Sequence, residues 1–433
     1  MSLSNISVSD LIAQYHAAEK TFPAGTLPIR EKAISSFQSL GFPTTKNEEW
    51  KYTNLASLLS MQFQTDSKET VSSIDVAQFL PVDSKFIALV FINGKLNSEF
   101  TNTELLPEGM IAGNVSEYLS HSAVQTQLGK IAMHQNESFV ALNTAMFLQG
   151  AFIYSPVNLI CEIPIHLIFI SDARANPALC YPRNLVVAEN SSSIKISESN
   201  YSIDSVNAAF TNSVNEIYVG QNANVEYCKN QSENNNDFRI DYTSAILQKD
   251  SKLNIHTITT GGKMVRNNLN IVLNDRNASA YLNGLYITDG QNHVDNHSFV
   301  DHKSPDCYSN ELYKGVLGGK STGVFNGKIF VRRDAQKTNA YQSNKNILLT
   351  NDASMNAKPQ LEIYADDVKC SHGATTGQLD EEALFYLRSR GIGVEQARAL
   401  LNIAFAEEIV ERITITSIRE KLEELIIERL KGM

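Results

Sequence analysis

A repeated unit of about 30 residues constrains the fold of this chain more than any other feature. Each unit is a small polar turn followed by a short strand, at residues 190–196, 222–227, 250–255 and 277–282. The first apolar strand positions of these units are 31, 28 and 27 residues apart: Ile194, Val225, Leu253 and Ala280. A near-constant step predicts stacked coils, each of which buries its inward residues against its neighbours. We therefore expect a solenoid of short strands, such as a β-helix, with small polar residues at corners that need a positive φ.

Similar units follow at residues 320–325 and 352–356, although the step into Val324 is irregular. The chain divides around this repeat into three predicted regions. Residues 1–150 begin with a helical pattern and contain an apolar strand at residues 86–92, which enters a tight turn at Asn93-Gly94. Residues 151–365 are rich in short β-branched strands, and residues 366–433 are helical.

The C-terminal region has recognisable helix signals. Asp380 is expected to cap a helix that ends at Gly391, and a longer helix is expected from Val394 to about Ile413. Ser417 and Glu420 are expected to form the capping box of a final helix. We expect these helices to cap the open end of the solenoid, as repeat proteins require, and a docking face for a partner is an alternative that the sequence leaves open.

Composition limits the class of function. The net charge of −10 argues against a general nucleic-acid or anionic-membrane binder. No apolar run approaches the roughly 20 residues that span a bilayer, and the N-terminus from Met1 to Ile6 lacks the pattern of a signal peptide. A cytoplasmic protein is therefore expected. The five cysteines are scattered and odd in number, so they predict neither a disulfide framework nor a self-contained zinc site.

Cys370 and His372 are the first candidate ligands. They lie two residues apart, so on an extended segment both side chains point to one face. Thiol and imidazole are ligands for soft or borderline metals and for iron–sulfur clusters. Two donors cannot complete a tetrahedral site. The pair is either half of a site shared with another chain or an ordinary Cys and His in a turn.

Three separated motifs carry a resemblance to a known family. They read NEEWKYTN at residues 47–54, DNHSFVDH at residues 295–302 with ELYKG at residues 311–315, and CSHGAT at residues 370–375 with LFYLRSRGI at residues 384–392. In this order they resemble the SufB/SufD family of iron–sulfur cluster assembly proteins, over nearly the whole chain. The Ser-His-Gly-Ala version of the last motif is most similar to the SufD branch.

The resemblance implies a mainly β protein with a right-handed parallel β-helix core, flanked by N-terminal and C-terminal helical domains. It implies a non-catalytic scaffold subunit that pairs with a SufB-like paralogue and binds a SufC-like ATPase through its C-terminal helices. His372 matches the position at the interface of the two paralogues, where the nascent cluster forms with a cysteine of the partner, and Cys370 is its neighbour. A transient iron–sulfur cluster would then be shared with the partner chain, and the isolated chain would hold no cluster. A homodimer is a further expectation for the isolated chain.

Other constellations have ordinary explanations. The group of His293, His297, His302, Asp295, Asp301 and Cys307 resembles a metal cluster, but it lacks the helical HExxH context, so a structural role in the β-helix is favoured. Residues 317–322 end like a phosphate loop, but Lys314 stands where its first Gly is required. The rival from another class is a β-helix polysaccharide lyase or hydrolase, for which the sequence offers Asp295, Asp301, Asp306 and Lys314.

Overall fold

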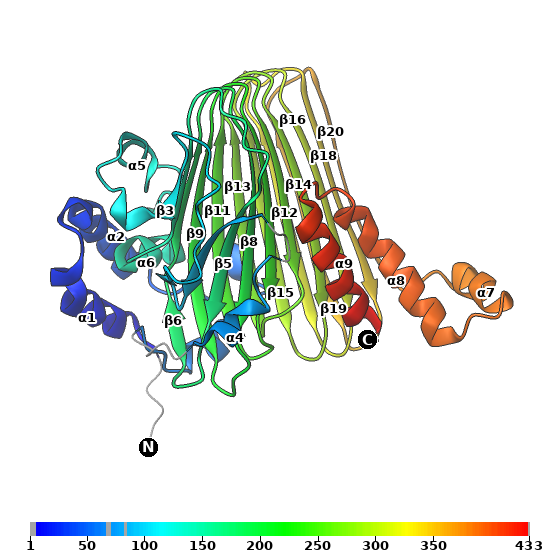
Figure 1. Cartoon of the computed structure of the whole chain (residues 1–433). Helices are drawn as coiled ribbons and strands as arrows, with labels where there is room; N and C mark the ends of the chain where they lie inside the picture. Colours follow the sequence, from blue (N-terminus) through cyan, green and yellow to red (C-terminus); the bar gives the residue numbers. More distant parts are fainter. Residues whose placement is uncertain (1–5, 66–70, 82–84, 432–433) are drawn as a thin grey trace.

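The computed structural model of the chain describes residues 6–65, 71–81 and 85–431. Residues 1–5, on which the expected lack of a signal peptide rests, lie outside the described residues. Within the described ranges, no helix combines the length and the apolar character needed to cross a membrane. The strands stack into one solenoid, and helices pack on two sides of it (Figure 1).

The solenoid is built from two sheets, because each coil contributes one strand to each of them. The first sheet contains β2 (Lys95–Leu96), β1 (Ile87–Ile92), β5 (Ile165–Ser171), β8 (Ser193–Ser202), β10 (Asn224–Ser232), β12 (Lys252–Thr259), β14 (Ser279–Thr288), β16 (Tyr308–Leu317), β18 (Thr338–Leu348) and β20 (Val368–Gly377), in this spatial order. The second sheet contains β19 (Ser354–Ile363), β17 (Thr322–Val331), β15 (His293–His302), β13 (Met264–Leu273), β11 (Phe238–Leu247), β9 (Ala209–Val219), β7 (Arg183–Ala188), β4 (Ala151–Ser155) and β3 (Ile111–Asn114), and β6 (Ala178–Cys180) pairs with β9. The coil strands pair in parallel, and β2 on β1 and β3 on β4 are antiparallel.

The register confirms the repeat that the sequence predicts. Val225 aligns with Ile194 on one side and with Leu253 on the other, and Leu253 aligns with Ala280. The same column continues through Ser309 and Ala340 to Cys370. The irregular step into Val324 has a simple cause, because Val324 lies on β17 of the second sheet. The true next position of the series is Ser309, which an apolar pattern does not reveal.

The polar corners also behave as predicted. One non-glycine residue with a positive φ precedes the first-sheet strand in seven successive coils: Asn158, Ser191, Asn222, Asp250, Asn277, Asp306 and Lys337. Asn and Asp tolerate this conformation because their short side chains bond to nearby backbone. Neighbouring corners also bond to each other, since Asn277 Nδ2 donates to Asp250 Oδ1 at 2.9 Å. The predicted turn at Asn93 and Gly94 is confirmed, with φ values of 47° and 77° between β1 and β2.

The inward side chains form the hydrophobic core of the solenoid. It runs from Ile87 and Ile165 through Ile196, Tyr227 and Leu282, all of which are nearly inaccessible. Toward the later coils the inward positions become polar. Glu311 aligns with Leu282, and Gln342 aligns with Glu311. One inward column of the core therefore becomes polar toward β20, while Ile329, Val331 and Ala340 keep an apolar cluster in the same coils.

Helices of the N-terminal region cover the outer face of the second sheet (Figure 1), whereas the short helix that contains Val76 packs on Ala88 and Ile168 of the first sheet. Their buried residues, such as Phe37 and Trp50, pack with Phe210 of β9 and Phe238 of β11 in one apolar cluster. The helices and helical turns of this region are α1 (Val8–Ala18), η1 (Glu19–Thr21), η2 (Ala24–Thr26), α2 (Leu27–Leu40), η3 (Glu48–Trp50), α3 (Ala56–Leu59), α4 (Ser73–Ala77), η4 (Val115–Glu117), α5 (Ser122–Gln127) and α6 (Ser138–Met146).

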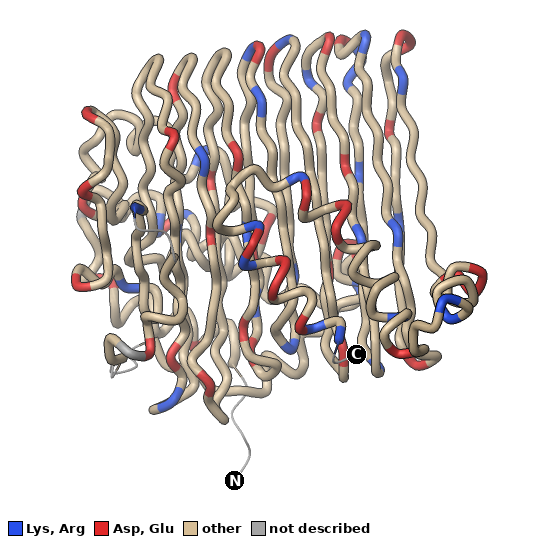
Figure 2. Tube along the Cα trace, turned by 45° about the vertical axis from the view of Figure 1, so that its right-hand side comes forward, with Lys and Arg blue, Asp and Glu red and all other residues tan. Residues whose placement is uncertain are grey.

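The C-terminal helices are α7 (Glu381–Ser389), α8 (Val394–Val410) and α9 (Thr416–Lys431). The Asp380 side chain accepts hydrogen bonds from the backbone of Glu382 and Ala383, which confirms the predicted cap of α7. The final helix begins at Thr416, so Ser417 lies inside it and the predicted capping box is not its N-cap. Residues of both charges occur along the C-terminal helices (Figure 2).

The expectation that these helices cap the open end of the solenoid is wrong. Ile409, Ile418 and Leu422 of α8 and α9 pack on outward residues of the first sheet, among them Ile258, Leu285 and Leu312. The physical reason is that these strands carry apolar side chains on their outer face as well, and burial of that face stabilises the helices there. The last coil is left uncovered by α8 and α9 and remains largely exposed.

Candidate functional site

The last coil differs from the earlier ones in exposure. Strands of the middle coils such as β11 and β14 are mostly buried, whereas nearly every residue of β20 from Ser371 to Gly377 is exposed. Among the described strands, β20 and β19 stand at the ends of their sheets and pair on one side only. An edge strand presents a row of unpaired backbone donors and acceptors, to which another chain can add. The open end of the β-helix therefore exposes backbone hydrogen-bonding groups that have no partner strand among the described strands.

Cys370 and His372 lie on β20 at this open end. The expected extended segment is confirmed, and the two residues align with Ala340 and Gln342 of β18. Their environments differ. Cys370 is half-buried against the apolar cluster of Ile329, Val331 and Ala340, and burial raises the pKa of its thiol. His372 is exposed. Because a thiolate is the form that binds metals, the more accessible imidazole is the better donor for a group that arrives from outside.

Two polar inward residues, Glu311 and Gln342, precede His372 at the same position of the two earlier first-sheet strands. Gln342 Nε2 donates a hydrogen bond to Glu311 Oε2 at 2.7 Å, and both residues are only 2–3% exposed. Burial raises the pKa of Glu311 to about 7. Within the described part of the chain, Gln342 Oε1 has no hydrogen-bond partner. Glu311, Gln342 and His372 thus occupy one inward column of three successive coils.

A second polar cluster joins the N-terminal motif to the outer face of β15. The Thr53 hydroxyl donates to Asp295 and lies 2.8 Å from His293 Nε2. His297 lies between two carboxylates, with Nε2 3.0 Å from Asp295 Oδ1 and Nδ1 3.3 Å from Glu49 Oε2. The NEEWKYTN motif by itself predicts a helix start with an anchoring aromatic and no chemical role, and it does not indicate this contact, because about 240 residues separate the two sides.

The electrostatics of this cluster are dominated by Asp295. Burial alone would raise its pKa, but Arg266, 2.6 Å away, together with His297 holds the pKa of Asp295 well below its usual range. Burial opposes the charged form of His297, and Asp295 outweighs it and raises the pKa of His297. The Arg266 guanidinium also lies 3.8 Å from the centre of the Trp50 ring. This cluster, the latch, ties the N-terminal motif to the outer face of the second sheet.

The remaining members of the predicted group do not join it. His302 is buried on the inward side, with Nε2 2.9 Å from Ser309 Oγ, and burial lowers its pKa to about 3. The Cys307 thiol is buried and lies 3.2 Å from the carbonyl oxygen of Asp275. Three or more His, Cys, Asp or Glu side chains do not gather into a metal-binding group anywhere in the described ranges.

The residues proposed for a polysaccharide enzyme also do not meet. Asp301 pairs with Arg332 at 2.7 Å, and Asp306 pairs with Arg276 at 2.9 Å. Lys314 lies on the other sheet, where its Nζ donates to the carbonyl oxygen of Phe405 in α8 at 2.8 Å. Retaining and inverting glycosidases need two facing carboxyl groups about 5–9.5 Å apart around the bond to be cleaved. The separate pairing of these residues does not favour that chemistry.

The C-terminal helices expose a second surface. Lys314 forms an ion pair with Glu408, and Arg412 Nη1 donates to Asn283 Oδ1 at 3.0 Å, so α8 is fixed on the first sheet. By contrast, α7 stands away from the strands (Figure 1). Its aromatic residues Phe385 and Tyr386 are 73% and 58% exposed. Both aromatic side chains are therefore left in contact with solvent.

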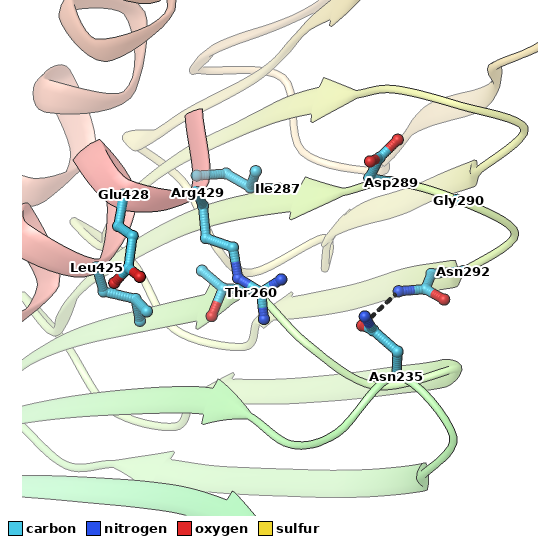
Figure 3. A pocket seen from close by; sticks show the side chains of 9 residues that line it. All are labelled: Asn235, Thr260, Ile287, Asp289, Gly290, Asn292, Leu425, Glu428 and Arg429. Atoms are coloured by element: carbon cyan, nitrogen blue, oxygen red, sulfur yellow. Dashed lines mark hydrogen bonds between the residues drawn. The ribbon is translucent and has the colours of Figure 1, made fainter. Parts of the chain in front are cut away.

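A cavity of about 610 Å³ lies between the end of α9 and turns of the solenoid (Figure 3). Arg429 and Glu428 of α9 stand on one side, and the bonded pair of Asn235 and Asn292 lies on the other. Neither Cys370 nor His372 lines it. The cavity is therefore separate from the site on β20.

Comparison with known proteins covers nearly the whole chain. Residues 8–167 match the SufBD protein N-terminal region, and residues 169–405 match the SufBD core domain of SUF system FeS cluster assembly. An iron–sulfur cluster assembly SufBD family protein of Synechocystis is 35% identical over 92% of this chain and 89% of its own length. The iron–sulfur cluster assembly protein SufD of Escherichia coli is 29% identical over 98% of both chains, and SufD of Bacillus subtilis is 25% identical over 94% of this chain and 95% of its own.

Proposed function

Because the chain belongs to the SufBD family of iron–sulfur cluster assembly and is SufD-like, we propose that it is a non-catalytic scaffold subunit of the SUF system. It pairs with a SufB-like paralogue and binds a SufC-like ATPase. The predicted boundary at residue 365 lies one strand too early, because β20 still belongs to the β-helix. In this proposal residues 1–150 brace the β-helix, the coils from residue 151 to β20 form its core, and the helices α7, α8 and α9 receive the ATPase.

The observation that carries the proposal is the open end of the β-helix. The exposed edges of β19 and β20 have hydrogen-bonding groups for another pair of strands. A paralogue with the same coil dimensions matches both edges at once, which adds strands to both sheets and buries the exposed face of β20. A second copy of this chain has the same dimensions, so a homodimer is the competing product when the paralogue is absent.

His372 is the residue that this interface would place on the nascent cluster. The cluster is the cargo of the scaffold, and its other ligands would come from the SufB-like chain. The exposed imidazole on an edge strand fits a site shared between two chains. Cys370 is the weaker candidate, because its thiol is half-buried and burial raises its pKa. A mixed set of imidazole and thiolate ligands suits a cluster that must later be released.

The C-terminal helices supply the proposed ATPase contact. The exposed side chains of Phe385 and Tyr386 on α7 are the anchors expected at the centre of such an interface. The α8 helix is tied to the outer face of the first sheet through Lys314. A movement of the bound ATPase would therefore be transmitted through α8 to β16, which lies two strands from β20 in the first sheet.

The proposal is tested by anaerobic cluster reconstitution on the complex of this chain with its SufB-like and SufC-like partners. We expect His372→Ala to keep the complex but lose most of the visible cluster absorption and bound iron, and Cys370→Ala to retain more of both. The double variant of Phe385→Ser and Tyr386→Ser should co-purify with the paralogue but not with the ATPase. Unchanged cluster content in the His372→Ala complex would reduce this chain to an architectural subunit.

A further inference from the structure

We propose that a pocket in the N-terminal region binds a small amphipathic carboxylate, with the anionic group on a cationic floor and the apolar body against aliphatic walls. The pocket lies between η2, α2, α5 and α6, beside the start of β7 and on the side of the molecule opposite to β20 (Figure 1). The proposal concerns a ligand that cluster assembly does not require, so it stands or falls separately from the function proposed above.

The first observation is a buried cation without a counter-ion. Arg30 of α2 is 0% exposed, and its guanidinium lies 4.3 Å and 4.1 Å from the ring centres of Phe22 and Phe147. Its Nε donates to Thr26 Oγ1 at 2.6 Å, and Nη1 donates to the carbonyl oxygen of Ala145 at 2.8 Å. Within the described residues Nη2 has no hydrogen-bond partner, and no carboxylate pairs with this guanidinium. Since buried charges in proteins are usually paired, an anion is missing here.

The neighbouring groups do not supply that anion. Burial lowers the pKa of Arg30 to about 10, Tyr15 opposes this shift, and the nearby Arg183 adds to it. The Tyr15 hydroxyl is itself without a partner among the described residues, so it does not accept from Nη2. The Glu216 carboxylate is already bound by Arg183 at 2.7 Å and by three backbone N–H groups. Two buried guanidinium groups and one buried carboxylate leave one positive charge in excess.

The second observation is a pocket beside this excess charge, with a volume of about 330 Å³. Thr26, Thr144 and Arg183 line it and are each at most 4% exposed, so they form its polar floor. Thr26 and Phe147 also contact the Arg30 guanidinium, as described above, and both line the pocket. The unpaired cation therefore lies one layer of side chains behind the floor.

The walls and the rim of the pocket restrict the class of anion. The exposed Lys130 and Gln125 stand at the rim, where Lys130 Nζ donates to the carbonyl oxygen of Gln125 at 2.9 Å. Among the described residues, no aspartate or glutamate lines the pocket. Its walls are aliphatic: Ile29, Leu119, Val124 and Leu128. An inorganic anion would leave these walls without contacts, and a neutral hydrocarbon would leave the charge unpaired.

Charge and size select the probe. A single excess positive charge matches a monoanion, which favours a carboxylate over a phosphate dianion. A volume of about 330 Å³ corresponds to roughly eleven water molecules at ~30 Å³ each. A ligand of about ten heavy atoms therefore fits, and octanoate has this size, one negative charge and an aliphatic body.

The test is isothermal titration calorimetry of octanoate into the full-length chain at neutral pH. Octanol has the same body without the charge, and acetate has the same head group without the body. We expect one octanoate site per chain and at least about 10-fold weaker binding of both octanol and acetate, because each lacks one of the two interactions.

Three variants locate the site. Arg30→Met removes the buried cation but keeps an unbranched side chain between the two rings, so we expect at least about 10-fold weaker octanoate binding and unchanged octanol binding. Lys130→Gln changes only the exposed rim and should weaken octanoate by about 2–5-fold. Lys32→Gln is the matched control, because Lys32 is an exposed cation of α2 that does not line the pocket, and octanoate affinity should stay the same. Circular dichroism checks that each variant folds.

The proposal would be overturned by two results in the wild type: no octanoate binding, or equal affinities for octanoate and octanol. Unchanged octanoate affinity in Arg30→Met and Lys130→Gln would place the bound octanoate elsewhere and overturn it as well. Lys130→Gln alone decides this point if Arg30→Met does not fold. The function proposed above would survive each of these results, because cluster reconstitution on the complex uses no carboxylate ligand.

Discussion

The interior of the β-helix is polar in two regions, and they differ in how their polar groups are paired. In the middle coils Lys229 lies 2.5 Å from Asp241 and 3.7 Å from Glu198, and Arg239 pairs with Glu233. Near the open end, the buried Glu311 is bonded to the neutral amide of Gln342, and His372 is exposed. The comparison teaches that the middle coils pair their buried carboxylates with cations of the same chain, whereas the later coils bury a carboxyl group against a neutral partner.

The largest effect is expected from breaking the paired region. Lys229→Met leaves the Asp241 and Glu198 carboxylates buried without their shared cation, so we expect a loss of about 3–5 kcal/mol in the free energy of unfolding. Chemical denaturation of the purified chain measures it. Lys369→Met on exposed β20 is the matched control and should change stability by less than about 0.5 kcal/mol. Equal losses in both variants would remove the distinction between the two regions.

A second prediction uses the pH dependence of the unpaired region. Because burial raises the pKa of Glu311 from 4.5 to about 7, the folded chain keeps this proton between those values and the unfolded chain loses it. Stability from this group is therefore fully present below pH 4.5 and is lost as pH rises to 7, by about 3 kcal/mol in total.

Glu311→Gln removes that contribution and leaves the other titrating groups in place. The fall in unfolding free energy between pH 5 and pH 7.5 should be smaller in the variant than in the wild type by most of this amount. Parallel pH profiles for the two proteins would show that the carboxyl group titrates normally, in conflict with its burial.

The smallest effect is expected at the latch on the outer face. Thr53→Val keeps the side-chain shape but removes the hydroxyl that donates to Asp295 and contacts His293, while the Arg266 pairing of Asp295 remains. We expect a loss of about 1–2 kcal/mol in unfolding free energy. Thr126→Val, on an exposed position of α5, is the control and should be nearly neutral. A neutral Thr53→Val would mean that the latch contributes orientation but little stability.

The sequence predicted most of the fold because its information is local and periodic. The step between Ile194, Val225 and Leu253 reflects one turn of the solenoid, and the corner residues require positive φ at the same place in each coil. The register of the later coils could not be predicted from the apolar pattern, because Ser309 and Gln342 replace apolar residues at inward positions. A polar inward residue cannot be told from an outward one by hydrophobic pattern alone.

The contacts between distant segments could not be predicted in this way. Nothing near Thr53 in the chain indicates that it meets Asp295, because the contact depends on how a helical region folds back over the second sheet. The placement of α8 and α9 was also missed. It depends on apolar outward residues such as Ile258 and Leu285, which lie in strands that are buried on both faces and therefore lack an alternating pattern. For the site, the residues Cys370 and His372 stood out by type, and their unequal burial required the structure.

The order of the coils along the sheets is also the order in which the ribosome makes them. Each new first-sheet strand from β8 to β20 pairs with a strand that was synthesised about 30 residues earlier, so the growing end always meets a template that already exists. Residues 370 and 372 lie on the final strand of this series. A chain that stops before residue 368 would therefore have every earlier coil and the whole N-terminal region, and yet would end on β18 in the first sheet, without Cys370 and His372. The edge that carries both candidate ligands thus exists only after the last strand of the β-helix has been made.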